Sequence, residues 1–399
     1  MKIVLITNLY RAYEDQLSSE NTQVVHFFAR EWVRQGHDVE VFVIWPHYPT
    51  LFNFLPEARK RRKHSFKESF NLDGVNIARI PLLKLPRVLC SDKSLVAASE
   101  LVIQSLGSRP DVVICHRVDP AAPVAAEVAK RSGVKYLLVL HKSDLQNFEN
   151  GRYFKKNAYI RSVDDADGIA FRSEYLQLRF EKVFPDFDRP TTVLKSGLSK
   201  SLIEKREFLV EKSGRPIRKV VTACRLNRDK NVDSLIAAMR SFPELELEIV
   251  GDGPEMARLK LMAKNDGTGE RIKFSGRLSN DETLSRMKDS DIFAMPSTRE
   301  TFGMVYLEAM SKGCITIGSR DQGIDGTIVD GRNGFLVKPG DTEELVGKIS
   351  LIKDLSAPER ERILLSALQT LEDMTEEKAA SEYVAFVETV LQREGKDGK

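Results

Sequence analysis

The sequence predicts an α/β protein made of two doubly wound domains, each with a parallel sheet covered by helices. Three observations support this prediction. Short β-branched runs alternate with longer amphipathic stretches along the whole chain, which is typical of parallel sheets covered on both faces. The length of 399 residues exceeds what one hydrophobic core usually serves. A polar, charged stretch closed by Gly-Arg-Pro separates the two halves.

The expected strands follow one another through both halves. In the first half they are the runs KIVLIT, DVEVFVI, VNIARI, DVVICH, YLLVLH, GIAF and TVLKSG. In the second half they are RKVVTAC, LELEIVG, RIKFSG, DIFAMP, CITIG and GFLVK. Because ligands of doubly wound sheets bind beyond the carboxyl ends of the strands, we expect a binding cleft between two domains that face each other.

The domain boundaries follow from these runs. We expect a first domain over residues 1–198, a linker over 199–216 and a second domain over 217–375. The remaining segment, 376–399, has the periodicity of an amphipathic helix. It either caps the second domain or returns to join the first, and the sequence leaves both arrangements open.

Composition restricts the class of protein. The chain is 42% hydrophobic and 30% charged, as expected of an ordinary globular protein. No run approaches the roughly 18 apolar residues of a membrane-spanning helix, and the opening MKIVLITN is too short for a signal peptide. The 4 cysteines are far apart and match no metal or redox spacing, so we expect no metal site and a cytoplasmic location.

Charge is distributed unevenly. Residues 1–200 contain 30 Lys and Arg against 23 Asp and Glu, whereas residues 201–399 contain 31 against 35. The basic excess is concentrated in residues 57–67, directly after the apolar run TLFNFLP. Two interpretations are open: a solvated loop, or an interfacial segment whose apolar side chains enter an anionic membrane at the inner face of the plasma membrane. The cations that would meet the lipid are Arg59, Lys60, Arg61, Arg62 and Lys63.

The stretch STRETFGMVYLEAM suggests a ligand site in the second half. A buried strand, DIFAMPS, precedes it, and GMVYLEAMSKG is the expected helix. The free amides of Phe302, Gly303 and Met304 at the start of that helix suit a phosphate. Glu300 and Glu308 would instead accept hydrogen bonds from sugar hydroxyls. The alternative is that Glu300 caps the helix and Glu308 is a solvated surface residue.

Three earlier strand exits add to this constellation. After the strand RKVVTAC, Arg225 and Lys230 could clamp a diphosphate and stabilise the charge that grows on it when a sugar leaves. The next strand ends at a glycine-rich turn, and the following one ends in FSGRL. The residues from these two turns that would frame the nucleotide are Gly251, Asp252, Gly253, Arg277 and Leu278.

The motifs CRLNRDKN, IVGDGPE, FSGRL, PSTRETFGMVYLEAM and GIDGTIVDGRNGFLVKPGD resemble, in order and spacing, those of family-four glycosyltransferases with the GT-B fold. The resemblance extends over nearly the whole chain. Glu300 and Glu308 match the E-x7-E motif, and Arg225 with Lys230 match the Arg/Lys pair. This resemblance implies a retaining transferase that uses a nucleoside-diphosphate sugar and needs neither a metal ion nor a further cofactor. It also implies that residues 1–198 form the acceptor-side domain and residues 217–375 the nucleotide-sugar-binding domain.

The first half carries a weaker resemblance. In GVKYLLVLHKSDL, His141 aligns with the family's histidine that approaches the donor sugar and phosphate, while His116 and Asp144 also fall at strand ends. Two positions depart from the family. Ser19-Glu20 stands where many members have a Gly-Gly pair that meets the donor phosphate, and Gly326 stands where many have a glutamate.

The expected function is transfer of a hexosyl-type sugar to a lipid-linked or glycan acceptor, as in bacterial surface polysaccharide synthesis. Two alternatives share the fold: a nucleotide-sugar epimerase, and a non-catalytic partner subunit of an active transferase. A dehydrogenase is disfavoured because GDGPE lacks the G-x-G-x-x-G spacing after a first strand. No nucleic-acid partner is expected.

Overall fold

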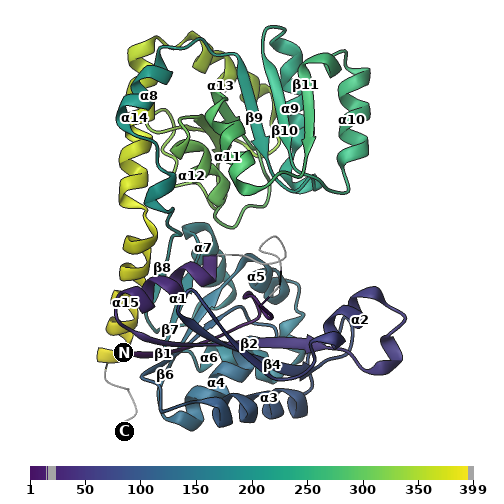
Figure 1. Ribbon diagram of the computed structural model, residues 1–399, viewed down its shortest axis with the longest axis vertical. Helices are drawn as coiled ribbons and strands as arrows, with labels where there is room; N and C mark the ends of the chain where they lie inside the picture. Colours follow the sequence, from purple (N-terminus) through teal and green to yellow (C-terminus); the bar gives the residue numbers. More distant parts are fainter. Residues whose placement is uncertain (15, 17–23, 394–399) are drawn as a thin grey trace. The chain divides into compact units, whose positions relative to one another are not determined.

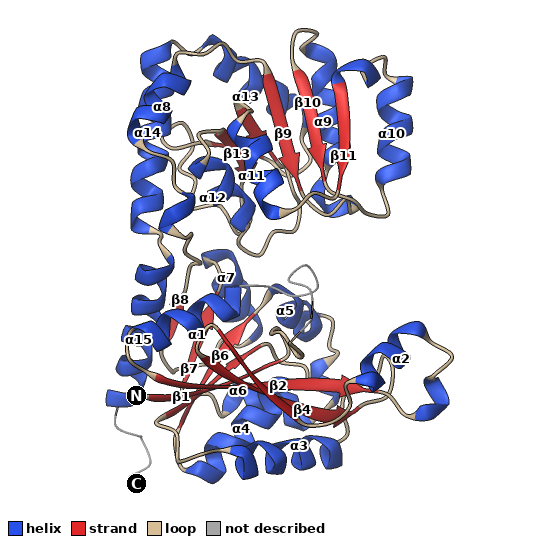
Figure 2. Cartoon of the chain, viewed as in Figure 1, coloured by secondary structure: helices blue, strands red, loops and turns tan. Residues whose placement is uncertain are grey.

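The computed structural model describes residues 1–14, 16 and 24–393, which form two compact units. The first contains residues 1–194 together with 376–399, and the second contains residues 195–375. Each unit has one sheet with helices on both faces (Figures 1 and 2). The prediction of two doubly wound α/β domains is confirmed.

The first unit contains an eight-stranded sheet in the order β3-β4-β2-β1-β5-β6-β7-β8. All neighbouring strands pair in parallel except β3, which is antiparallel to β4. The strands are β1 (Lys2–Thr7), β2 (Asp38–His47), β3 (Glu68–Leu72), β4 (Val75–Leu83), β5 (Val112–His116), β6 (Lys135–Leu140), β7 (Gly168–Phe171) and β8 (Thr191–Val193).

Alternating side chains of these strands build two cores, one on each face of the sheet. In β1, Val4 and Ile6 join one core, whereas Ile3 and Leu5 join the other, as the two-residue period of a strand requires. The helices of the first core are α3 (Asp92–Ser105), α4 (Ala121–Ser132), α5 (Lys142–Glu149), α6 (Asn157–Asp164) and α7 (Glu174–Val183). The second core is covered by α1 (Val24–Arg34) and α15 (Glu376–Gln392).

The C-terminal helix α15 completes the first unit. Its buried Tyr383, Phe386 and Val387 pack in the same core as Phe28 and Trp32 of α1. The structure thus selects one of the two arrangements that the sequence left open: residues 376–393 return to the first unit rather than cap the second.

The second unit contains a fully parallel six-stranded sheet in the order β11-β10-β9-β12-β13-β14. Its strands are β9 (Lys219–Ala223), β10 (Glu246–Val250), β11 (Ile272–Gly276), β12 (Ile292–Ala294), β13 (Ile315–Ser319) and β14 (Phe335–Val337). Its helices are α8 (Arg206–Ser213), α9 (Val232–Ala238), α10 (Met256–Asn265), α11 (Asn280–Lys288), α12 (Met304–Ser311), α13 (Thr342–Asp354) and α14 (Ala357–Asp373). The strand order reverses between β9 and β12, which defines a topological switch point.

The structure corrects the expected linker. Residues 199–216 belong to the second unit and contain α8, whose Leu209 is buried in the core. The buried Lys212 ammonium donates to the carbonyl of Lys312 over 2.8 Å, which ties this segment to the end of α12. The unit boundary therefore falls at residues 194 and 195.

Residues 50–67 leave the carboxyl end of β2 as a short 3-10 turn, Thr50–Phe52, followed by α2 (Pro56–Lys63). In Figure 1, α2 projects from the sheet edge beyond β2 and β4. None of the described helices is long and apolar enough to span a bilayer.

Candidate functional site

In the second unit, the predicted residues gather where the strand order reverses. Residues 224–231 follow β9, and residues 295–303 follow the neighbouring β12. Two loops that leave adjacent parallel strands in opposite directions create a crevice for ligands at the carboxyl edge of the sheet. Arg225 and Lys230 lie in the first loop, and Glu300 lies in the second.

Asn231 joins these two loops. Its backbone has a left-handed φ of 48°, which asparagine tolerates better than most residues. Its side-chain amide donates to the carbonyl of Pro296 over 2.7 Å and to the hydroxyl of Thr298 over 2.6 Å. The amide of Thr298 in turn donates to the carbonyl of Asp229 over 2.8 Å. Sequence reasoning missed Asn231, although an asparagine directly before a helix is a recognisable cap signal.

Lys230 and Glu300 form an ion pair within this framework. The distance from Lys230 Nζ to Glu300 Oε2 is 2.6 Å, and the two side chains are only 16% and 14% exposed. Burial lowers the pKa of the Lys230 ammonium, but the neighbouring groups, chiefly the Glu300 carboxylate, together raise it by more, so the pKa lies above its ordinary value. Lys230 is therefore a fixed positive charge, and Glu300 holds it in place.

Two charged groups of the site have no such partner in the part of the chain that the structure describes. Arg225 is exposed, and none of the described residues forms an ion pair or side-chain hydrogen bond with its guanidinium. Glu308, in α12, is partly buried, and burial raises the pKa of its carboxyl group. No described residue donates a hydrogen bond to that carboxyl group either. A partly buried carboxylate without donors is unfavourable, so Glu308 suits a ligand that brings hydroxyl groups.

The start of α12 is shaped by Gly303. Its φ is 87°, and a Cβ at this position would lie 2.4 Å from the Tyr306 ring. Tyr306 is fully buried and donates to the carbonyl of Met295 over 2.7 Å. The glycine therefore lets the chain turn above a fixed ring. Phe302 fills the core with its side chain, whereas the amides of Phe302, Gly303 and Met304 have no acceptor among the described residues.

Gly251 and Gly253 set the distance between neighbouring strand exits. A Cβ on Gly251 would lie 1.8 Å from the carbonyl oxygen of Cys224, and one on Gly253 would lie 2.5 Å from that of Leu226. The two loops are also bonded, because the Leu226 amide donates to the Asp252 carbonyl over 3.0 Å. This turn therefore holds the backbone on either side of Arg225. From the sequence, a tight turn explained these glycines nearly as well as a ligand did.

The remaining predicted residues lie at the edges of this site. Asp252 is exposed, and its carboxylate accepts from the amide of Gly253 over 2.7 Å. Arg277 is exposed after β11, whereas Leu278 packs against the core. Gly251 connects the two turns, since its amide donates to the carbonyl of Gly276 over 2.7 Å.

In the first unit, His141 belongs to a histidine pair. It directly follows β6, and its Nε2 lies 3.4 Å from Nδ1 of His116 at the end of β5. Asp144 accepts from the amide of His141 over 2.9 Å and from the amide of Val118 over 3.2 Å. Burial, together with the charges of Arg172 and Arg117, lowers the pKa of His141 to about 3. The imidazole of His141 is therefore neutral at physiological pH.

Tyr383 of α15 reaches the other side of His116. The distance from its hydroxyl to His116 Nε2 is 3.1 Å. Sequence reasoning assigned Tyr383 only to the apolar face of a helix and gave no role to Arg172. Ser19 and Glu20, the predicted departure from the family pattern, lie outside the described residues.

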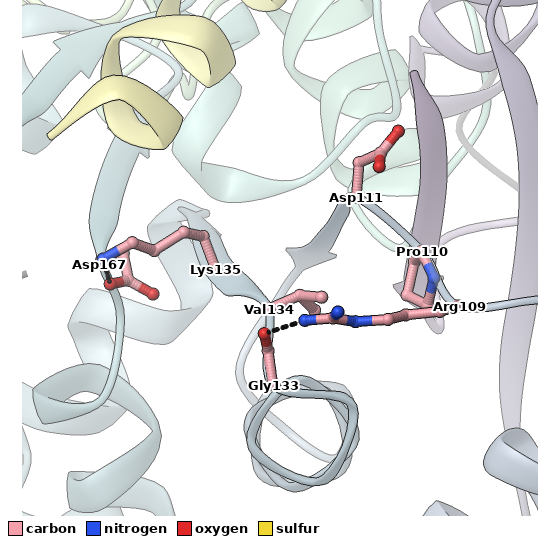
Figure 3. A pocket seen from close by; sticks show the side chains of 7 residues that line it. All are labelled: Arg109, Pro110, Asp111, Gly133, Val134, Lys135 and Asp167. Carbon is pink, nitrogen blue, oxygen red and sulfur yellow. Dashed lines mark hydrogen bonds and ion pairs between the residues drawn. The ribbon is translucent and has the colours of Figure 1, made fainter. Parts of the chain in front are cut away.

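A pocket of about 560 Å³ lies at the opposite, amino-terminal edge of the same sheet (Figure 3). Arg109 spans it and donates to the carbonyl of Gly133 over 2.7 Å. Lys135 is paired with Asp167 over 2.9 Å. Both cations therefore already have partners within the first unit. The pocket is also at the other edge of the sheet from the strand ends that carry the histidines.

Comparison with known proteins matches both units to glycosyltransferase families. Residues 22–193 match the model described as glycosyl transferase 4-like domain. Residues 204–365 match the model described as glycosyl transferases group 1.

Two curated relatives are similar over part of their length. The sulfoquinovosyl transferase SQD2 of Arabidopsis thaliana is 36% identical over 33% of this chain and 25% of its own. The GDP-mannose-dependent alpha-(1-6)-phosphatidylinositol monomannoside mannosyltransferase of Mycolicibacterium smegmatis is 31% identical over 51% of this chain and 57% of its own.

A solved structure shows the same fold over nearly the entire chain. HepE of Anabaena, in complex with UDP, aligns with a TM-score of 0.70 and 18% identity. The alignment covers 98% of this chain and 100% of that one.

Proposed function

Because this chain belongs to the family-four glycosyltransferases of GT-B fold, we propose that it moves a hexosyl unit from a nucleoside-diphosphate sugar to a lipid-linked or glycan acceptor. The sequence-based assignment to this family and to a glycosyltransferase activity is confirmed. One observation carries the proposed donor site: the strand exits at one switch point carry the fixed cation Lys230, the exposed Arg225 and Glu308, whose carboxyl group accepts no hydrogen bond from the described residues.

The proposed reaction retains the configuration of the sugar and uses no metal ion. The acceptor oxygen forms a bond to the anomeric carbon on the face from which the nucleoside diphosphate departs. The leaving phosphate takes the proton of the acceptor hydroxyl, so no separate protein base is needed. Arg225, Lys230 and the amides before α12 stabilise the negative charge that grows on the phosphate.

The two glutamates recognise hydroxyl groups in this proposal. Glu308 accepts hydrogen bonds from the ribose, and Glu300 accepts them from the transferred sugar while it stays beside Lys230. The phosphate would then share the Lys230 ammonium with Glu300, since one ammonium has three donors. His141 of the first unit, neutral and partly exposed, is proposed to contact the donor sugar.

A thermal-shift screen of UDP-, GDP- and ADP-sugars tests this proposal. A donor that binds the folded protein raises its melting temperature with concentration. The same donor with a labelled sugar then shows transfer to membrane lipid or glycan extracts. A donor that changes into an epimer without an acceptor would favour the epimerase, and calorimetry that detects no nucleotide binding would favour the non-catalytic partner.

We also propose that residues 50–67 bring the acceptor-side unit to an anionic membrane. Leu51, Phe54 and Phe66 are 79%, 73% and 53% exposed. The exposed cations beside them are Arg59, Lys60, Arg62 and Lys63. Arg61 differs from the prediction: its guanidinium lies 2.7 Å from Glu57 and stacks 5.2 Å from the centre of the Trp45 ring, so it supports the segment internally.

The neighbouring strand exit extends this apolar edge. Leu83 pairs with His47 in the register of β2 and β4, and the exposed Leu85 and Val88 follow it. Exposed apolar side chains next to clustered cations are typical of surfaces that bind anionic lipid. This edge belongs to the proposed acceptor-side unit, which fits an acceptor presented at a lipid surface.

Vesicle flotation separates this surface from a solvated loop. The wild type should bind vesicles that contain anionic lipid and should release them at high salt. Changing the four exposed cations to Gln should abolish binding. The matched control changes Lys205, Arg206, Lys260 and Lys264, which are exposed in the second unit. Equal binding by all three proteins would contradict the proposed surface.

A further inference from the structure

Tyr383 is the last of three polar side chains in contact with one another, a series that begins at the proposed site residue His141. His141 Nε2 lies 3.4 Å from His116 Nδ1, and His116 Nε2 lies 3.1 Å from the Tyr383 hydroxyl. His116 and Tyr383 are both buried, with 1% and 0% exposure, whereas His141 is partly exposed. This series of contacts therefore leads from the accessible imidazole of His141 into the core of the first unit.

The protonation states of the three groups constrain one another. Burial, with smaller effects from His141 and Arg172, holds the pKa of His116 well below its ordinary value. Burial also raises the pKa of the Tyr383 hydroxyl well above its ordinary value. Both imidazoles are therefore neutral, and each has one N–H and one lone pair. If His116 Nδ1 accepts, His141 Nε2 must donate, and the reverse holds for the other tautomer.

The Tyr383 ring is held in one position by its neighbours. Its ring centre lies 5.2 Å from that of Phe28 and 4.9 Å from that of Trp32, and both contacts are edge-to-face. Among the described residues, the Tyr383 hydroxyl is the one group that meets His116 Nε2. When the Tyr383 phenol donates its O–H to Nε2, His116 carries its proton on Nδ1 and donates it to His141 Nε2, so this one hydrogen bond sets both tautomers.

We infer that Tyr383 is a positioning residue: acting through His116, it fixes the orientation and tautomer of the His141 imidazole for sugar transfer. This inference rests on the proposed function, because it assumes that His141 contacts the donor. It gives α15 a second role beside closing the core. A residue more than two hundred positions further along the chain would then control which His141 ring nitrogen carries the proton.

The test combines kinetics with nitrogen-15 NMR of the histidine rings. Tyr383→Phe keeps the ring contacts and removes only the hydroxyl. We expect kcat to fall about five- to tenfold, the size of one lost neutral hydrogen bond, with KM for the donor unchanged. The ring nitrogen shifts of His116 and His141 should change together. Tyr10→Phe is the matched NMR control, because Tyr10 bonds a different buried histidine, His26, over 2.6 Å.

A double-mutant cycle gives a second measurement. His116→Phe should break the same series of contacts from its middle, so Tyr383→Phe should cause little further loss of kcat in that background. Additive losses, or a Tyr383→Phe protein with unchanged ring nitrogen shifts or unchanged kcat, would overturn the inference. If the wild type transfers no sugar, the proposed function fails, whereas the NMR measurement still decides whether Tyr383 sets the His141 tautomer.

Discussion

The two units use the same topology to present different chemistry. In each, the strand order reverses beside the first parallel strand, between β1 and β5 in one unit and between β9 and β12 in the other. The second unit places a charged pair and an exposed arginine beyond this point. The first unit places two neutral histidines there, backed by a tyrosine. The fold thus fixes where a site forms, and the loop residues fix its charge.

The comparison also separates local from long-range construction. In the second unit, the charged residues come from loops and a helix between Arg225 and Glu308, and backbone hydrogen bonds join those loops. In the first unit, His116 and Tyr383 are 267 positions apart. Local sites of the first kind leave motifs of fixed spacing in the sequence, and sites of the second kind do not.

The largest effect is expected at the charged site. Lys230→Ala should lower transfer by ten- to about a hundredfold, because losing a charge-assisted contact to the leaving phosphate costs roughly 1.5–3 kcal/mol. Glu308→Ala should also lower it more than tenfold. The measurement is kcat/KM with the donor found by the screen. The control is Lys260→Ala, which changes an exposed lysine of α10 in the same unit and should leave kcat/KM unchanged. Equal kcat/KM values in all variants would show that Lys230 and Glu308 do not belong to the donor site.

A smaller effect, on stability, should distinguish two glycines of the second unit. Gly303→Ala should lower the free energy of unfolding by about 1–3 kcal/mol, because the left-handed φ of 87° and the Tyr306 ring both oppose a Cβ. Gly347 lies inside α13 with nothing within 4 Å of an added Cβ. Gly347→Ala should therefore raise stability by about 0.5–1 kcal/mol. Urea unfolding followed by circular dichroism measures both, and a neutral Gly303→Ala would show that α12 can start elsewhere.

A pH-dependent effect on stability is expected at the neutral histidine site. His141 has a folded-state pKa of about 3, whereas an unfolded histidine titrates near 6.5. As pH falls below about 6.5, the unfolded chain binds a proton that folded His141 does not, so this histidine reduces stability by about 1.4 kcal/mol per pH unit. Asp144 has the opposite effect on the pH dependence of stability. Burial raises its folded pKa to about 6, so its contribution makes the protein less stable as pH rises.

The His141→Gln variant isolates the histidine contribution. Its unfolding free energy should fall less steeply than that of the wild type between pH 6 and pH 4. Fluorescence reports on the correct unit, because the chain has 2 tryptophans, Trp32 and Trp45, and both are in the first unit. Parallel slopes would mean that His141 is charged in the folded protein.

The strands were predictable because their patterns are strong, but three features were not. β3 (ESFNL) has no apolar run, since it is an antiparallel edge strand whose side chains are exposed or only partly buried. Helix α8 looked like a linker because half of its residues are charged, while Leu209 and the stem of Lys212 provide its buried contacts. The Lys230–Glu300 pair joins residues from two separate motifs. Each motif was recognisable, but their mutual contact depends on the loop bonds of Asn231 and Thr298.

The return of α15 to the first unit has a consequence for biosynthesis. When the ribosome has made residues 1–194, the apolar face of α1 and the space beside Gly168 are not yet covered by Phe386 and Val390. The intervening 195–375 must emerge before that surface is covered. The first unit can therefore finish folding only after α15 has emerged, and until then the nascent chain exposes an apolar face that chaperones would recognise.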